Sequence, residues 1–348
     1  MATPSQSLSP PPPPPMNLWV ILSESKRIIN AHSRHFLALS VLFLLPLCFS
    51  VTVYPSVFRL ITDQSSASHN SVSLLRGLHQ NDDVDTKTTV LLLIGYIVVV
   101  TVFNLLAIGS IAYSVFQGFY GRPVKLISAV KSSFASFLPL LATLISSNFI
   151  VLGVFMILGI LAFLLTKVIE IIPGVEFDNA SSYFQGFIIV VTIMSIAIAI
   201  KLYVNWILAW VVVVVESAWG LSPLKRSQSL VKGMKGVSLS IIFFFASTES
   251  ILVWISTLAA SAQLIDDENG GKLWTNAFFV VQIVITSAFL TLLTLYNLAA
   301  TTVMYMYCKA VHGELVWEIA EEFARDYVSL PFDDGKVPHL VSVAYNHI

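Results

Sequence analysis

Residues 216–236 read ESAWGLSPLKRSQSLVKGMKG, a short basic stretch that joins two long apolar segments. The segment before it, Phe187–Val215, has Lys201 near its middle, and the segment after it, which ends at Ser261, has Glu249 near its middle. An ionisable side chain inside a bilayer is costly unless it is paired or hydrated. The pattern therefore predicts a membrane protein with two opposite charges in its interior. The basic residues of the joining stretch are Lys225, Arg226, Lys232 and Lys235.

The composition excludes several classes of protein. Hydrophobic residues make up 56% of the 348-residue chain and charged residues only 11%, which leaves too little polar surface to cover a soluble domain. The mean hydropathy is +0.81. The net charge of −1 offers no basic excess that could neutralise phosphates, so nucleic acid is not a predicted partner. The predicted environment is the lipid bilayer.

Six apolar windows are each long enough to cross a membrane. An α-helix needs about 20 residues to span the hydrocarbon core. The windows are apolar all round, whereas the strands of a membrane barrel alternate between apolar and polar residues. The predicted fold class is therefore all-α, a polytopic membrane protein with six transmembrane helices. The windows are Phe36–Phe58, Thr88–Gly121, Ser132–Thr166, Asn179–Val215, Gly236–Ile265 and Leu273–Cys308.

The distribution of basic residues predicts the orientation. Of the 19 Lys and Arg residues, 13 fall in segments on the side of the N-terminus and five on the opposite side. Basic loops stay in the cytoplasm, so both termini are predicted to be cytoplasmic. The predicted divisions are a disordered proline-rich tail at 1–15, a transmembrane domain at 16–312 and an acidic cytoplasmic tail at 313–348.

Cytoplasmic interfacial helices are predicted before the first, third and fifth spans. Leu18–Ser33, Arg122–Phe134 and Ser222–Met234 each mix basic residues with spaced apolar ones, which is typical of helices that lie in the membrane surface. Their similarity leaves a threefold repeat as one alternative. At the third stretch, the cations Lys225, Arg226 and Lys232, with Lys235 just after it, are expected to face anionic lipid headgroups. Leu221, Leu224, Val231 and Met234 share an approximate apolar stripe.

The intramembrane charges predict a polar cluster. Helical rise places Lys201 and Glu249 at a similar depth, about 20 Å from the cytoplasmic face, so we expect an ion pair between them, direct or bridged by water. Asn205 lies one turn from Lys201 and extends the cluster. Further buried amides are expected among the other helices, at Asn104, Asn148 and Asn297.

Two interpretations of this cluster stay open, polar contacts that hold helices together and a pathway for a solute or proton. Carriers commonly have helices broken by Gly or Pro near the midplane. Phe187–Val215 contains neither residue, and Pro46 and Pro139 are expected near helix ends. This favours the structural interpretation.

The sequence contains no recognisable catalytic or metal-binding motif. It has no phosphate-cradling glycine loop, no nucleophile elbow and no paired-histidine zinc signature. All seven histidines fall outside the predicted spans. The protein is therefore predicted to be no enzyme and to need no cofactor or metal.

Two stretches resemble known membrane proteins. The run from Glu216 to Leu221, with Lys225-Arg226-Ser227 and Leu230-Val231-Lys232-Gly233, resembles an element in the membrane domain attached to some bacterial glycerophosphodiester phosphodiesterases. The proline-rich leader followed by Glu24-Ser25-Lys26-Arg27-Ile28 looks like a plant family of uncharacterised multi-pass proteins. The resemblance implies six helices. It does not imply phosphodiester cleavage, because the catalytic domain is missing from the chain.

These patterns lead to a ranked set of functional hypotheses. The first is a non-enzymatic protein of the endomembrane system or plasma membrane that organises lipids or partner proteins through its interfacial helices and cytoplasmic tails. The alternative is a carrier or channel for a small solute or ion that uses Lys201 and Glu249. The third is a membrane enzyme with dispersed catalytic residues.

Overall fold

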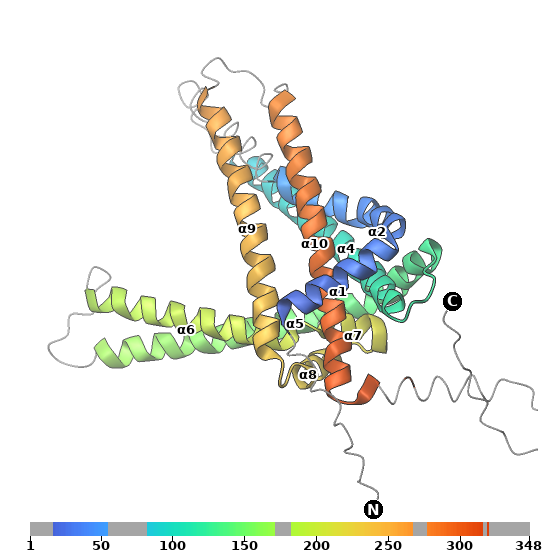
Figure 1. The fold of residues 1–348 in the computed structure, drawn as a ribbon. Coiled ribbons are helices and arrows are strands. Elements are labelled where there is room, and N and C mark those ends of the chain that lie inside the picture. The colour runs from blue at the N-terminus through green and yellow to red at the C-terminus, as the bar shows by residue number, and fades with distance from the viewer. Residues whose placement is uncertain (1–16, 55–81, 171–181, 267–276, 316–318, 320–348) are drawn as a thin grey trace, which may run out of the picture. The chain divides into compact units, whose positions relative to one another are not determined.

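The computed structural model describes residues 17–54, 82–170, 182–266, 277–315 and 319, and every regular element in these ranges is a helix (Figure 1). The helical segment from Ser33 to Tyr54 contains a π-helical turn, η1, and continues after it as α-helix. The elements are α1 (Leu18–Ala31), α2 (Ser33–Leu39), η1 (Ser40–Leu44), α4 (Asp82–Phe119), α5 (Leu126–Glu170), α6 (Ser182–Trp206), α7 (Ala209–Glu216), α8 (Ser222–Leu230), α9 (Lys235–Asp266) and α10 (Ala277–Val311).

Six segments of the described chain are long and apolar enough to cross a membrane, which confirms the six predicted spans. Each overlaps the apolar window expected at that place in the sequence. The segments are Ser33–Tyr54, Val90–Phe119, Leu126–Val168, Phe184–Glu216, Lys235–Leu258 and Val280–Val311.

The chain divides into two compact units, Met1–Tyr305 and Met306–Ile348. In the second unit, α10 ends in a turn where His312 Nδ1 lies 2.8 Å from the Cys308 carbonyl oxygen. Gly313 follows with a φ of 75°, the left-handed conformation that commonly terminates a helix. The predicted N-terminal tail and most of the predicted acidic tail lie outside the described residues.

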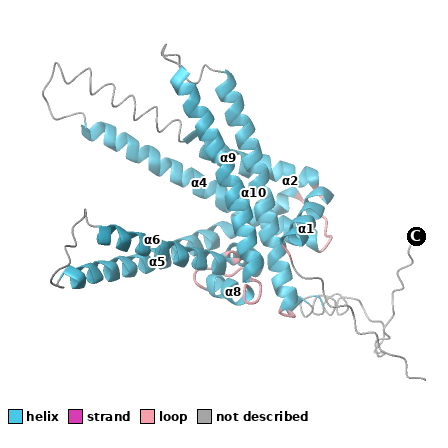
Figure 2. Cartoon of the chain, turned by 60° about the vertical axis from the view of Figure 1, so that its left-hand side comes forward, coloured by secondary structure: helices cyan, strands magenta, loops and turns pink. Residues whose placement is uncertain are grey.

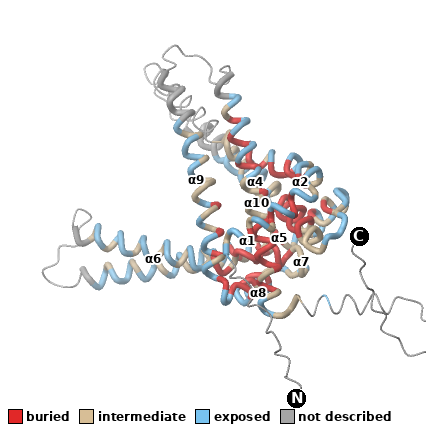
Figure 3. Tube along the Cα trace, viewed as in Figure 1, coloured by how far each residue is buried: buried red, intermediate tan, exposed pale blue. Residues whose placement is uncertain are grey.

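The core of the first unit forms where α4, α5 and α7 meet. Leu105 and Ile108 from α4, Leu140 from α5 and Val213 from α7 form one buried apolar cluster. Figure 3 shows the buried residues gathered around α1, α5, α7 and α8. The short α7 contacts α4, α5 and α8. It is therefore surrounded by protein, although it belongs to an apolar span.

Helices α4 and α5 approach closely at small residues. A Cβ atom added to Gly109 would lie 2.9 Å from the Ser133 Cα atom. The Ser133 hydroxyl donates a hydrogen bond to the Leu106 carbonyl oxygen at 2.7 Å. Small residues let membrane helices come near enough for such contacts. A hydrogen bond to the backbone therefore holds α4 and α5 together in addition to apolar packing.

The distal halves of α5 and α6 run side by side as a hairpin (Figures 1 and 2). Large apolar residues such as Phe163 and Ile193 are exposed on it. None of the residues in the most apolar 18-residue window of α5 is buried, and only 6% of the corresponding window of α6 is buried. In water such a surface would be strongly unfavourable. It matches the acyl chains of a bilayer.

The fourth span is broken between α6 and α7. Helix α6 ends at Trp206 and α7 begins at Ala209, although the sequence between Phe187 and Val215 has no Gly or Pro. The absence of Gly and Pro from this run therefore does not keep the helix continuous. Ser227 of α8 bridges the break, because its hydroxyl donates to the Asn205 carbonyl oxygen at 2.7 Å and accepts from the Leu208 N–H at 3.2 Å.

The turn from α7 to α8 is fixed by a second set of contacts. Ser217 and Gly220 have left-handed φ angles of 52° and 71°, which reverse the chain within a few residues. Glu216 accepts a hydrogen bond from the Tyr305 hydroxyl at 2.8 Å and pairs with Arg226, whose Nε lies 3.3 Å from Oε2. The stretch from Glu216 to Gly233, which carries the resemblance noted in the sequence, thus forms a corner that connects α7, α8 and α10.

The predicted apolar stripe of the third interfacial stretch faces protein rather than lipid. Leu224, Val231 and Met234 are buried, and only Leu221 is exposed. Helix α8 contacts α5, α6 and α7. The stripe is amphipathic as expected, but the bundle supplies the apolar surface that it covers.

The other two predicted interfacial helices differ from each other. Helix α1 forms as expected, with Ile21 and Ile28 buried and Trp19 exposed at 72%. Residues 122–125 are non-helical, and the rest of the stretch to Phe134 belongs to the long α5. A separate helix is therefore present before two of the three spans, which weakens the threefold repeat.

Both prolines expected near helix ends lie inside helices. Pro139 is interior to α5. Pro46 follows η1, where the Leu45 N–H reaches back to the Ser40 carbonyl oxygen. Proline cannot donate the helical hydrogen bond, and the preceding π-turn is one way in which a helix absorbs that loss.

We expect Ser227→Ala to destabilise the first unit by about 1–3 kcal/mol, because two buried backbone groups at the break lose their partner. The measurement is thermal unfolding of the protein in lipid nanodiscs. Ser229→Ala on the same helix is the control, because Ser229 is exposed and its loss should change stability by less than about 0.5 kcal/mol. Equal effects of the two substitutions would show that the bridge contributes nothing.

Candidate functional site

Two cavities of the first unit, an outer one that is open to the surface and a more enclosed inner one, share a set of polar side chains. The outer cavity has a volume of about 620 Å³ and the inner cavity about 370 Å³. Asn104 of α4, Glu249 of α9 and Thr294 of α10 line both cavities. These residues come from three separate spans, so tertiary packing alone brings them together.

Glu249 is the acidic group of this site. Its Oε1 atom is buried and has no hydrogen-bond partner among the described residues. Asn297 of α10 lines the inner cavity together with Glu249. Because a buried carboxyl oxygen without a partner is unfavourable, the site has an unused capacity to bind a proton, a donor or a cation.

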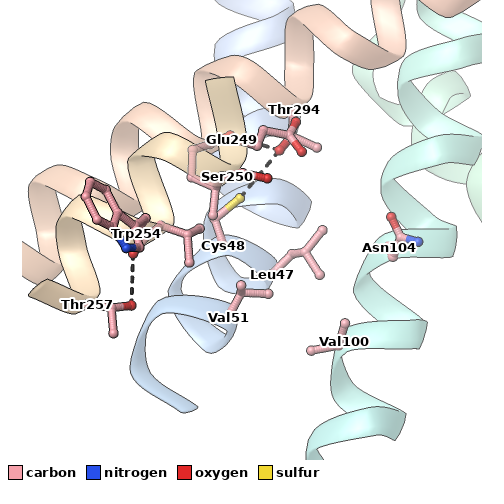
Figure 4. A pocket seen from close by; sticks show the side chains of 12 residues that line it. Leu47, Cys48, Val51, Val100, Asn104, Glu249, Ser250, Trp254, Thr257 and Thr294 are labelled. Atoms are coloured by element: carbon pink, nitrogen blue, oxygen red, sulfur yellow. Dashed lines mark hydrogen bonds between the residues drawn. The ribbon is translucent and has the colours of Figure 1, made fainter. Parts of the chain in front are cut away.

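The wall of the outer cavity opposite α9 comes from the first span and from α4. Figure 4 shows Leu47, Cys48 and Val51 on one helix and Val100 and Asn104 on another. The Cys48 Sγ atom lies 3.9 Å from the Thr294 Oγ1 atom, and that hydroxyl donates to the Leu290 carbonyl oxygen at 2.8 Å. The polar groups are thus grouped around Glu249, and the rest of this wall is aliphatic.

The inner cavity lies beside the broken span. Tyr203 on α6, Ile207 at the break and Trp210 on α7 line it together with Glu249. Discontinuous helices beside a polar cavity are a recurring arrangement in membrane carriers. The break between α6 and α7 therefore lies in the wall of the inner cavity.

The predicted direct ion pair between Lys201 and Glu249 is not formed in the described part of the chain. Lys201 is exposed, whereas Tyr203 is the α6 residue that shares the inner cavity with Glu249. Successive helical residues are about 100° apart, so Lys201 lies on roughly the opposite side of α6 from Tyr203. The two charges are separated by helix rotation, which depth in the membrane does not specify.

Asn205 does not join Glu249 either. Asn205 is buried, with an exposed fraction of 8%. Its backbone carbonyl oxygen accepts the hydrogen bond from the Ser227 hydroxyl. The three predicted members of the cluster therefore lie in different places. Lys201 is on an exposed face of α6, Asn205 is beside the helix break, and Glu249 lines the cavities. The version of the pair that is bridged by water stays a prediction.

Part of the site was visible in the sequence. Asn104 and Asn297 are two of the three amides that the sequence predicts as buried, and both line the inner cavity. The prediction of burial was wrong for Asn104 and Asn148, which are exposed, and Asn297 is half-buried. Cys48 and Tyr203 gave no such signal, because a thiol or a phenol in an apolar run is compatible with ordinary core packing. Their place in the site depends on which helix faces meet.

The predicted membrane-surface cations have different environments. Lys225, Lys232 and Lys235 are exposed. Arg226 is partly buried and paired with Glu216. Three of the four predicted headgroup ligands are thus accessible, whereas the fourth contributes to the corner between α7 and α8.

No group of three or more His, Cys, Asp and Glu side chains that could hold a metal ion occurs within the searched, described ranges. Within the described ranges, six segments have the length and apolar character of membrane spans, which is the pattern of a polytopic helical membrane protein. The chain belongs to the family described as domain of unknown function DUF8558, whose model matches residues 15–335. No curated protein and no solved structure matches the chain.

A double-mutant cycle should show that Lys201 and Glu249 are independent. We expect Lys201→Met and Glu249→Gln to change the free energy of unfolding additively, within about 0.5 kcal/mol, because the groups share no contact. The matched cycle of Glu249→Gln with Asn297→Ala should give a larger coupling energy. Unfolding in mixed micelles measures both cycles. A coupling energy above about 1 kcal/mol between Lys201 and Glu249 would show that the two residues form an ion pair after all.

Proposed function

We propose that the protein is a non-enzymatic carrier that binds a small organic cation at Glu249 within the membrane. The observation that supports this proposal is the buried, unpartnered Glu249 Oε1 atom at the junction of two cavities. A carboxylate in this environment is stabilised by a positive charge. Lys201 does not supply that charge in the described structure, so a cationic solute takes the place of the predicted internal partner.

The neighbouring groups suit an organic cation. The amide oxygens of Asn104 and Asn297 and the Thr294 hydroxyl oxygen carry partial negative charge that attracts a cation, and all three residues line the inner cavity. The broken span supports movement as well as binding, because a helix in two parts can change its angle without disrupting either part. Movement of α7 against α6 would alter the wall of the inner cavity.

The binding proposal is tested with tetraethylammonium and the protein in lipid nanodiscs. We expect Glu249→Gln to weaken binding, measured by calorimetry, by about tenfold or more, because the substitution keeps the shape and removes the charge. Glu24→Gln is the matched control, because Glu24 lies on α1 and pairs with Arg27. Equal affinity of the Glu249→Gln variant and the unsubstituted protein would refute the proposal. Tetraethylammonium flux in proteoliposomes should fall in parallel.

A second candidate function is the organisation of anionic lipids or partner proteins at the membrane surface. Trp19 and Trp219 are exposed at 72% and 70%, and tryptophan is enriched where a protein meets the interface. Lys225, Lys232 and Lys235 are exposed near Trp219 in the sequence. This combination supports binding of anionic headgroups at the cytoplasmic side. In the same role, the cytoplasmic tails would bind a partner protein.

The surface role predicts selectivity for phosphatidylserine. Replacing Lys225, Lys232 and Lys235 together by Gln should abolish the preference of the reconstituted protein for spin-labelled phosphatidylserine over phosphatidylcholine. Added salt should weaken the preference of the unsubstituted protein, since exposed charges are screened. Lys201→Gln is the control for loss of one cation. An unchanged preference in the triple variant would remove this candidate.

The surface role includes a proposed membrane orientation and cellular compartment. The excess of basic residues in alternate loops supports cytoplasmic termini, and the resemblance of the leader to a plant multi-pass family supports a place in the endomembrane system or plasma membrane. In this orientation the α7–α8 corner lies at the cytoplasmic side, which is where the lipid role requires it.

A further inference from the structure

We infer that the solute bound at Glu249 is an amphipathic organic cation, whose charged head contacts Glu249 and whose apolar body fills the outer cavity. This inference rests on the proposed function and narrows its substrate class. A volume of about 620 Å³ falls within the range of about 300–1,000 Å³ that is typical of sites for small organic ligands.

The distribution of side chains gives the outer cavity a polar end and an apolar body. Asn104, Glu249 and Thr294 are shared with the inner cavity and therefore lie at the junction. The aliphatic and aromatic lining consists of Leu47, Val51, Val100, Val253, Trp254 and Leu290. A ligand that satisfies both parts has one charged end and an extended hydrophobic portion.

The outer cavity is accessible from the protein surface. Ser250 is exposed, and Trp254 is exposed at 64%. Both residues lie on α9 next to Glu249 and line the cavity. Since α9 is a membrane span, an amphiphile dissolved in the bilayer can reach the cavity sideways. The Trp254 indole also offers a π-face for an ammonium group on its way to Glu249.

Other occupants would use only half of this site. A lipid acyl chain fits the apolar wall but leaves the Glu249 oxygen without a partner. A small hydrated inorganic cation matches the carboxylate but gains nothing from Val51, Val100 or Trp254. An amphipathic cation uses the charge and the apolar volume together, which is why the geometry favours it.

The inference is tested by comparing octyltrimethylammonium with tetraethylammonium in nanodiscs. Val100→Trp fills the outer cavity from α4 and should weaken octyltrimethylammonium binding by about tenfold, while tetraethylammonium binding stays within about twofold. Val99→Trp is the matched control, because Val99 is exposed and lines neither cavity. It should change neither affinity. Glu249→Gln should weaken both ligands.

A measurement on the unsubstituted protein covers the case in which Val100→Trp fails to fold. An octyltrimethylammonium analogue with a diazirine at the end of its chain should label Leu47, Val51 or Val253 on irradiation. Excess unlabelled octyltrimethylammonium should suppress that labelling. Labelling confined to the exposed faces of α5 and α6 would overturn the inference and indicate ordinary partition into lipid.

The outcomes separate the inference from the proposed function. If tetraethylammonium binding depends on Glu249 but Val100→Trp leaves octyltrimethylammonium binding unchanged, the substrate class is wrong and the cation site stands. If neither ligand depends on Glu249, both proposals fail. Loss of octyltrimethylammonium binding alone in the Val100→Trp variant supports the amphipathic class.

Discussion

A backbone break inside a membrane must have its hydrogen bonds satisfied by the protein itself, because the acyl chains offer neither donors nor acceptors. In this structure the Ser227 hydroxyl meets that requirement between α6 and α7, as acceptor for one side of the break and donor for the other. Because Ser227 belongs to α8, these two hydrogen bonds form only when α8 lies against the break. The corner at Glu216, Arg226 and Tyr305 then holds α8 where the bridge can form.

The break has consequences for the interior of the first unit. It allows α7 to pack among α4, α5 and α8, while the distal part of α6 accompanies α5 with most of its surface exposed. One span therefore contributes both to the protein core and to the lipid-facing surface. Tyr203, Ile207 and Trp210 line the inner cavity on either side of the break, so the element that needs the Ser227 bridge also shapes the candidate site.

We propose a binding role for Glu249 because it differs from the ordinary structural contacts between the helices. Interhelical polar contacts in membranes are stabilising when each partner is satisfied, as at Ser133 and Leu106. Glu249 differs, because one of its oxygens is buried without a partner in the described chain and the residue lines two cavities. Keeping such a group is unfavourable for stability, and unfavourable polar groups in membranes commonly mark function.

The sequence by itself determined the fold class and the six spans, because the length and polarity of each apolar window are set by local composition. It also identified Glu249, Asn104 and Asn297 as unusual residues for a bilayer. The tertiary structure alone decided that Tyr203, and not Lys201, faces Glu249, that Ser227 bridges a break without Gly or Pro, and that the apolar face of α8 covers protein. The physical reason is that helix rotation and partner choice depend on contacts between distant segments, and composition along one segment contains no information about them.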